Sequence, residues 1–168
     1  MIERNGIGGL ERRLVNGFGA LACGGLLGYA LYAQHGLGLE PCPLCVFQRV
    51  AVLALGVVFL AAYAHNPRRR GARVYGVLAA IAAGAGIAFA WRQLWLQNLP
   101  ADQVPECGPG LDFIMDVFPL WEALAMVFKG SGDCAKVDWT FLGLSMAGWV
   151  LISLASLALL ALWNNFRR

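Results

Sequence analysis

The chain has 168 residues, enough for one modest domain, but 59% of them are hydrophobic and only 14% are charged. Soluble domains are about 25% charged, so this composition excludes a freely soluble enzyme. The net charge of only +3, with no stripe of arginines along one face, also excludes nucleic-acid binding.

Four apolar stretches predict membrane-spanning helices at roughly residues 14–33, 45–63, 74–96 and 140–163. Each has about the 20 residues needed to cross a bilayer, and lipid forces such segments to be helical. The first stretch is longer than the apolar core of a cleaved signal peptide, so we expect it to be retained. The sequence therefore predicts a single all-α membrane domain over residues 1–168, a four-transmembrane-helix bundle.

The basic residues predict the orientation of this bundle. Nine of the thirteen lie in the two terminal segments and in the turn between the second and third spans, while eight of the ten acidic residues lie on the other side. By the positive-inside rule, both termini and the turn at Asn66 are cytoplasmic. The loops at residues 34–44 and 97–139 then face outward, into the periplasm of a bacterial cell.

Four of the five cysteines belong to these two outer loops or to the helix end beside them, namely Cys42, Cys45, Cys107 and Cys134. That is the oxidising side of the membrane, where disulfides form. A disulfide between Cys42 and Cys45 would close almost no loop, so their spacing favours a redox pair over a structural bridge. We expect Cys45 in the first turn of the second helix, where the helix dipole favours a thiolate.

Two other interpretations of the cysteines stay open. For Cys107 and Cys134, a purely structural disulfide is a comparable alternative. A zinc site is a weaker one, because Cys107 and Cys134 lack the Cys-x-x-Cys spacing typical of zinc ligands. We therefore predict no metal. Cys23, in the middle of the first span, is expected to be a small packing residue.

Polar residues within the spans indicate a second component of the site. Arg49 follows Cys45 by four residues and so lies on the same helix face. Arg92 and Gln93 lie near the outer end of the third span. An arginine inside a membrane is costly and commonly faces a pocket, although Arg49 could also extend to the outer head groups. A guanidinium beside a thiol could hydrogen-bond a membrane-soluble carbonyl compound, and a quinone fits this description.

The outer loop also contains an apolar stripe from Phe113 to Phe128 at near-helical spacing, interrupted by Pro119. This pattern predicts a short helix that either packs against its own protein or lies in the outer membrane interface.

Two runs of residues resemble the DsbB family of bacterial thiol oxidases. They are Glu-Pro-Cys-Pro-Leu-Cys-Val-Phe-Gln-Arg (40–49) and Ser-Gly-Asp-Cys-Ala (131–135), the latter followed by Trp-Thr-Phe-Leu-Gly-Leu (139–144). The four spans, the basic inner turn and the two outer cysteine pairs match as well, so the resemblance covers nearly the whole chain. Two positions differ from the common family pattern. Ala147 replaces a proline, and Gln93 takes the place of a histidine associated with quinone.

The resemblance implies a relay in the bacterial inner membrane. A periplasmic DsbA-like dithiol partner would pass electrons to Cys107–Cys134, these would pass them to Cys42–Cys45, and a membrane quinone (ubiquinone or menaquinone) would accept them. Arg49 and Gln93 would contact the quinone.

Two alternatives remain at this point. A vitamin-K-epoxide-reductase-like protein is also a four-helix quinone-linked enzyme, but its redox pair lies near the end of the chain. A non-enzymatic four-helix scaffold with structural disulfides would fit the same composition. Reduction of quinone by a reduced dithiol partner distinguishes an enzyme from the scaffold.

Overall fold

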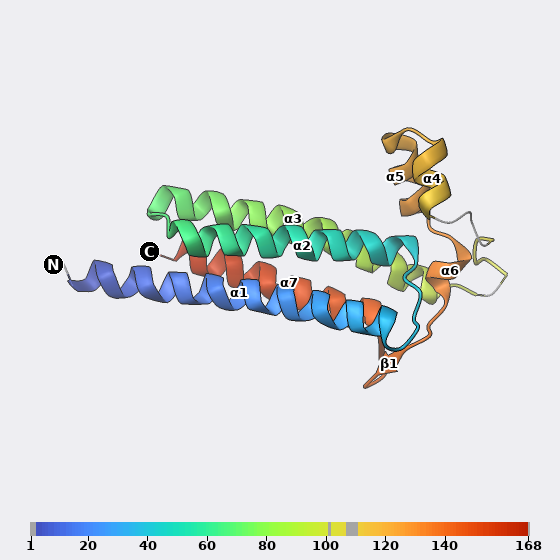
Figure 1. Cartoon of the computed structure of the whole chain (residues 1–168), viewed down its shortest axis with the longest axis horizontal. Helices are drawn as coiled ribbons and strands as arrows, with labels where there is room; N and C mark the ends of the chain where they lie inside the picture. Colours follow the sequence, from blue (N-terminus) through green and yellow to red (C-terminus); the bar gives the residue numbers. More distant parts are fainter. Residues whose placement is uncertain (1–2, 101, 107–110, 168) are drawn as a thin grey trace.

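The computed structural model describes residues 3–100, 102–106 and 111–167. Four long helices run side by side, with a cap of short elements at one end (Figure 1). They are α1 (Glu3–His35), α2 (Pro43–His65), α3 (Arg69–Gln97) and α7 (Met146–Phe166). By length and composition, all four can cross a membrane. The predicted all-α bundle of four transmembrane helices is confirmed.

Small residues allow the helices to pack closely. A Cβ atom at Gly19 would lie 2.7 Å from the ring of Phe59, so only glycine lets α1 approach this buried side chain of α2. The Cβ atom of Cys23 lies 3.0 Å from the position that a Cβ would take at Gly56. Close backbone approach of this kind is typical of helix pairs in membranes. Cys23 is therefore buried in the core, far along the bundle from the other described cysteines.

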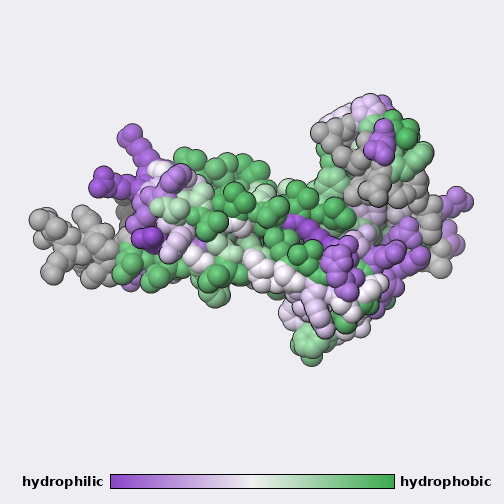
Figure 2. All heavy atoms as spheres, viewed as in Figure 1, coloured by the Kyte–Doolittle hydropathy of each residue, from purple (hydrophilic) through white to green (hydrophobic). Residues whose placement is uncertain are grey.

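The outer surface of the bundle is apolar. Figure 2 shows hydrophobic residues over the middle of the bundle and hydrophilic residues gathered at its two ends. Large apolar side chains from all four helices are more than half exposed, among them Phe18, Leu21, Val57, Leu60, Ile81 and Leu159. An exposed apolar belt of this extent requires lipid as its solvent. The chain is thus a multi-pass membrane protein.

Both termini and the turn between α2 and α3 lie at the end of the bundle opposite the short elements (Figure 1). Asn66 closes α2 in the left-handed conformation (φ 40°), and its N–H donates to the carbonyl of Ala62 at 3.0 Å. Near the same end, the buried Asn164 donates to the side-chain oxygen of buried Asn16 at 3.2 Å. This side-chain hydrogen bond joins α7 to α1 inside the membrane, where a buried amide requires a partner.

The loop after α3 contains three short helices, α4 (Leu111–Val117), α5 (Leu120–Lys129) and α6 (Gly132–Ala135). The break between α4 and α5 falls at Phe118 and Pro119, where the sequence stripe is interrupted. One face of these helices is buried through Ile114, Ala123 and Val127, while Phe113 and Trp121 are exposed. One face of the stripe therefore packs against the protein itself, which is the first of the two alternatives.

The last transmembrane helix begins later than the predicted residue 140. Residues 140–145 instead form a hairpin of β1 (Thr140–Phe141) and β2 (Leu144–Ser145), which pair antiparallel. The two turn residues, Leu142 and Gly143, have φ values of 51° and 79°. Right-handed helix needs negative φ, so this turn excludes residues 140–145 from α7. The prediction began the helix too early because the segment is apolar, and hydropathy does not indicate a turn.

Candidate functional site

The structure places Cys42 and Cys45 at the start of α2. Cys42 is the N-cap residue, with an extended backbone, and its sulfur accepts a hydrogen bond from the backbone N–H of Cys45 at 3.3 Å. Pro43 occupies the first helical position, which needs no N–H donor and suits the fixed φ of proline. The local sequence thus folds the Cys-x-x-Cys segment into a helix start. The sulfur atoms of Cys42 and Cys45 lie 2.7 Å apart.

Cys134 approaches the same point from the outer loop. It is fully buried in α6, in a cluster with Cys42, Leu44 of α2 and Leu96 of α3. Its hydrogen bond with Cys42 lowers the pKa of Cys134 to about 6, with further help from the backbone of Leu44 and Ser131 and against the effect of burial. The same hydrogen bond is the main cause that raises the pKa of the Cys42 thiol. These opposite directions of the two pKa values favour Cys134 as the thiolate and Cys42 as the proton donor.

The segment that carries Cys134 is held by α3. Arg92 donates from Nε to the carbonyl of Phe128 (3.1 Å) and from Nη2 to that of Lys129 (2.8 Å), at the C-terminal end of α5. Gly130 follows with φ 80°, and a Cβ atom there would lie 2.4 Å from Leu96. A cation at the C-terminal end of a helix is favourable. These contacts fix where the chain enters α6.

Cys107, the fourth cysteine of the predicted site, lies outside the described residues. Its neighbour Glu106 accepts a hydrogen bond from the backbone N–H of Gly132, at 3.2 Å. The described chain before Cys107 is thus joined to the turn before Cys134.

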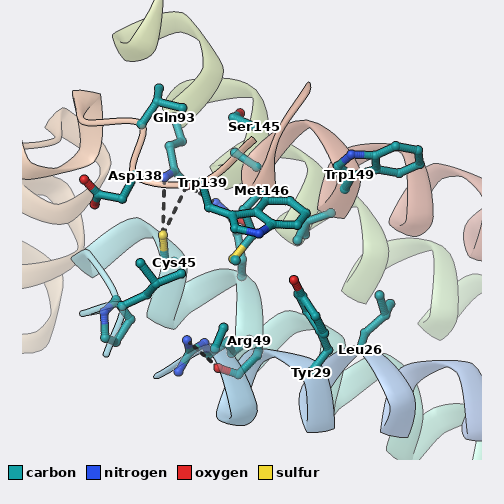
Figure 3. A pocket seen from close by; sticks show the side chains of 18 of the residues that line it. Leu26, Tyr29, Cys45, Arg49, Gln93, Asp138, Trp139, Ser145, Met146 and Trp149 are labelled. Carbon is teal, nitrogen blue, oxygen red and sulfur yellow. Dashed lines mark hydrogen bonds between the residues drawn. The ribbon is translucent and has the colours of Figure 1, made fainter. Parts of the chain in front are cut away.

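Two glutamines lie on the membrane side of the sulfur atoms, and one of them, Gln93, contacts these atoms. Gln48 of α2 and Gln93 of α3 are 4% and 5% exposed, and Gln48 Nε2 donates to Gln93 Oε1 at 2.7 Å. Gln93 Nε2 donates to the sulfur of Cys45 at 3.3 Å and to that of Cys42 at 3.5 Å. Figure 3 shows the contact between Gln93 and Cys45. Gln93 therefore contacts the redox pair directly, whereas the family resemblance had associated this residue with quinone.

Arg49 lies one turn below Cys45 and is held by α1. Its Nη1 donates to Gln34 Oε1 at 2.5 Å, and its Nη2 donates to the carbonyl of Ala30 at 3.2 Å. Gln34 was not singled out from the sequence, although a lone polar side chain at the end of an apolar span is a usable signal. The two hydrogen bonds use part of the guanidinium, which has five N–H donors in total.

A cavity of about 160 Å³ connects these side chains. Cys45, Gln48, Arg49 and Gln93 line its polar side, and α1, α7 and the segment 136–139 that precedes the hairpin supply most of the rest. Figure 3 shows rings from three of these segments around it, namely Tyr29, Trp139 and Trp149. The rings of Tyr29 and Trp139 meet edge to face, with centroids 6.0 Å apart. An apolar, aromatic cavity with a few convergent donors is typical of a small-molecule site.

The hairpin is fixed onto this cavity from two sides. Ser145 donates to the side chain of Gln97 at the end of α3, at 2.7 Å, and Trp149 of α7 donates to the carbonyl of Phe141 at 3.0 Å. Trp139 and Phe141 stack with centroids 6.1 Å apart. Sequence reasoning did not predict that this segment forms a wall of the site, because its partners are distant along the chain.

Comparison with known proteins gives one consistent result. Residues 12–164 match the protein family described as "Disulfide bond formation protein DsbB". The chain is 53% identical to the disulfide bond formation protein B of Chromobacterium violaceum, over 89% of this chain and 90% of that protein. It is 52% identical to that of Marinobacter nauticus, over 95% of both chains. It is 51% identical to that of Nitrosococcus oceani, over 94% of both chains.

Proposed function

Because the chain belongs to the DsbB family of membrane disulfide oxidoreductases, we propose that it reoxidises a periplasmic DsbA-like dithiol protein and passes the electrons to a membrane quinone. The observation that carries the proposal is the gathering of three cysteines: Cys134 is buried in one cluster with Cys42, and the Cys42 sulfur lies 2.7 Å from that of Cys45. Sulfur atoms this close can exchange disulfides without long-range movement of the helices.

The proposed route consists of thiol–disulfide exchanges, each of which breaks one S–S bond and forms another. A thiolate of the partner attacks the Cys107–Cys134 disulfide at Cys107, since Cys134 is buried. Cys134 leaves as a thiolate, which its lowered pKa favours. It then attacks Cys42 of the Cys42–Cys45 disulfide, and the electron pair of that bond passes to Cys45. The second thiolate of the partner displaces Cys107 from the mixed disulfide, which leaves the partner oxidised. The Cys107 thiolate in turn displaces Cys42 from the Cys42–Cys134 disulfide, so the Cys107–Cys134 bond forms again and Cys42 and Cys45 are left as thiols.

The proposed acceptor site is the cavity beside Cys45. Its donor set fits a quinone, because Arg49 supplies a charged donor for a carbonyl oxygen and the aromatic walls suit a flat ring. Quinone in this position would take up two electrons and two protons, and the Cys42–Cys45 disulfide would form again. A DsbA-like partner has a potential of about −120 mV, so only a strong oxidant of this kind restores its disulfide.

We also propose that the protein lies in the bacterial inner membrane with both termini in the cytoplasm. The termini and the basic α2–α3 turn share one end of the bundle, and the described cysteines of the proposed route, at the start of α2 and in α6, lie at the other (Figure 1). The basic end suits the cytoplasmic side, and the cysteine end then meets periplasmic partners.

The test is a purified assay in lipid nanodiscs. Reduced thioredoxin-fold dithiol partner is mixed with the protein and a soluble ubiquinone or menaquinone analogue, and quinone absorbance is followed. We expect one quinone reduced per partner disulfide formed. Cys42→Ser or Cys45→Ser should abolish quinone reduction, while the matched variant Cys23→Ser should leave it unchanged. Quinone reduction at the normal rate by Cys42→Ser or Cys45→Ser, or none by the unaltered protein, would overturn the proposal.

A further inference from the structure

Gln48 and Gln93 have buried carboxamide side chains inside the helix bundle, beside the Cys42–Cys45 pair. The hydrogen bond between them fixes their relative orientation. Burial of an amide in a low-dielectric interior is costly unless its polar atoms are bonded. Here Gln48 Nε2 donates to Gln93 Oε1 at 2.7 Å, the shortest side-chain contact of either residue. The carbonyl oxygen of Gln93 is therefore turned toward α2.

A planar amide with its oxygen so engaged must direct its NH₂ group elsewhere. That group lies 3.3 Å from the sulfur of Cys45 and 3.5 Å from that of Cys42. The thiol form of Cys45 can also donate to Gln93 Oε1, at 3.5 Å. A thiolate has no proton to donate to Oε1, so of the two polar groups of the Gln93 amide only the NH₂ group can hydrogen-bond a thiolate.

We propose that Gln48 and Gln93 form an amide pair that stabilises the thiolate of Cys45. Gln93 is the catalytic residue, because it contacts the reacting sulfur, and Gln48 is a positioning residue that keeps the NH₂ group facing it. The proposal rests on the proposed function and deepens it. When attack on Cys42 breaks the Cys42–Cys45 bond, the electron pair stays on the Cys45 sulfur, and the Gln93 N–H donates to it without transferring a proton.

The alternative donor, Arg49, is less well placed for this role. Two of its N–H groups donate to Gln34 and Ala30 of α1, whereas no hydrogen bond to either sulfur is recorded for it among the described residues. The two donors therefore have different targets. Gln93 donates a hydrogen bond to the sulfur, and Arg49 remains available to donate to a ligand in the cavity.

The test measures the reactivity of Cys45 without quinone or partner. Fully reduced protein in nanodiscs is treated with a small neutral alkylating reagent, and modification of each cysteine is followed by peptide mass spectrometry. Loss of a hydrogen bond to a charged group should slow alkylation of Cys45 in Gln93→Leu by about tenfold at neutral pH. Gln48→Leu should slow it by a smaller factor, because the amide of Gln93 becomes free to turn.

Asn98→Leu is the matched control. Asn98 is an amide at the C-cap of α3, and its side chain donates to the carbonyl of Leu94 at 2.7 Å rather than to a sulfur. We expect alkylation of Cys45 at the normal rate in this variant. In strongly alkaline solution, where the thiol is ionised in every variant, the rates should converge. A defect of packing or access would persist there.

The outcomes are separable. Equal rates in Gln93→Leu and the unaltered protein, the same slowing in Asn98→Leu, or a difference that persists in alkaline solution would each overturn the amide pair. Failure of the unaltered protein to reduce quinone would overturn the proposed function and would leave this comparison valid.

Discussion

The surroundings of Cys134 strongly alter the acidity of its thiol. Its pKa of about 6 lies well below the ordinary 9.0, chiefly because Cys42 donates a hydrogen bond to it. The thiolate is therefore present above about pH 6 and is lost as the pH falls through that value. In reduced Cys107→Ser protein, we expect the ultraviolet absorbance of one thiolate to appear around this pH, relative to a Cys107→Ser/Cys134→Ser reference.

The cause of the shift can be tested separately. Cys42→Ala removes the hydrogen-bond donor, so the absorbance step assigned to Cys134 should move toward the ordinary thiol range. Cys23→Ser, which alters a distant core position, should leave the step in place. A step near the ordinary value in protein that retains Cys42 would contradict the assignment of the thiolate to Cys134.

The planar guanidinium of Arg49 donates hydrogen bonds to both Gln34 and Ala30 at the same time. Lysine has one nitrogen and cannot reproduce that geometry, so we expect Arg49→Lys to raise the KM for quinone. Arg49→Ala should also lower kcat by about tenfold or more, the effect of one lost hydrogen bond to a charged group. Both are measured by steady-state quinone reduction.

Gln34→Leu is the control for Arg49, because it removes the contact with α1 but keeps the guanidinium. If Gln34→Leu reproduces the kinetic loss of Arg49→Ala, the arginine acts by joining α1 to α2 rather than by contacting quinone. Normal quinone kinetics in Arg49→Ala, with reduced yield of folded protein, would make Arg49 a membrane anchor.

At the scale of elements, the position of α5 relative to α3 decides whether Cys134 reaches Cys42. Arg92 bonds the last carbonyls of α5, and its guanidinium stacks on Trp95 at 4.2 Å. In a Cys45→Ser/Cys107→Ser background, mild oxidation should form a Cys42–Cys134 disulfide. We expect Arg92→Ala to slow its formation by about tenfold, measured by gel shift after thiol labelling. Arg92→Lys, which keeps the charge and can bond one carbonyl, should lose less.

An unchanged rate in Arg92→Ala would mean that Leu96 and Gly130 alone position the segment. The kinetics of the Cys42–Cys45 pair with quinone give a second measurement, and they should not change, because Arg92 contacts neither cysteine in the described structure.

The elements differ in how far sequence could predict them. The four helices follow from apolar length alone, and the split between α4 and α5 follows from Pro119. The start of α7 could not be predicted from hydropathy, because Leu142 and Leu144 are as apolar as a membrane span, although Leu142 is a turn residue of the hairpin and Leu144 begins β2. At the site, Cys42 and Cys45 were recognisable from their spacing. The contacts Gln48–Gln93 and Gln34–Arg49 join different helices, so no local pattern indicates them.

At the scale of the whole molecule, charge and chemistry separate along the bundle axis. Basic residues of the N-terminal part of α1, of the α2–α3 turn and of the end of α7 lie at one end of the described bundle, while the described redox cysteines lie at the other end. A cysteine introduced at Asn66 should therefore be shielded from a membrane-impermeant thiol reagent in intact bacteria, and one introduced at Gln103 should be labelled. Labelling at Asn66 would reverse the orientation and remove the periplasmic partner from the proposal.

Cys42 contacts both Cys45 and Cys134, so on the proposed route every electron pair must pass through the Cys42 sulfur, one pair at a time. One sulfur can form only one disulfide at a time, so electron pairs must leave in the order in which they arrive. A fully oxidised chain deprived of quinone has two disulfides and should take up two dithiol equivalents, then stop. A higher concentration of reduced partner would therefore not raise the turnover rate beyond a limit. That limit is the rate at which Cys42 is released for the next exchange.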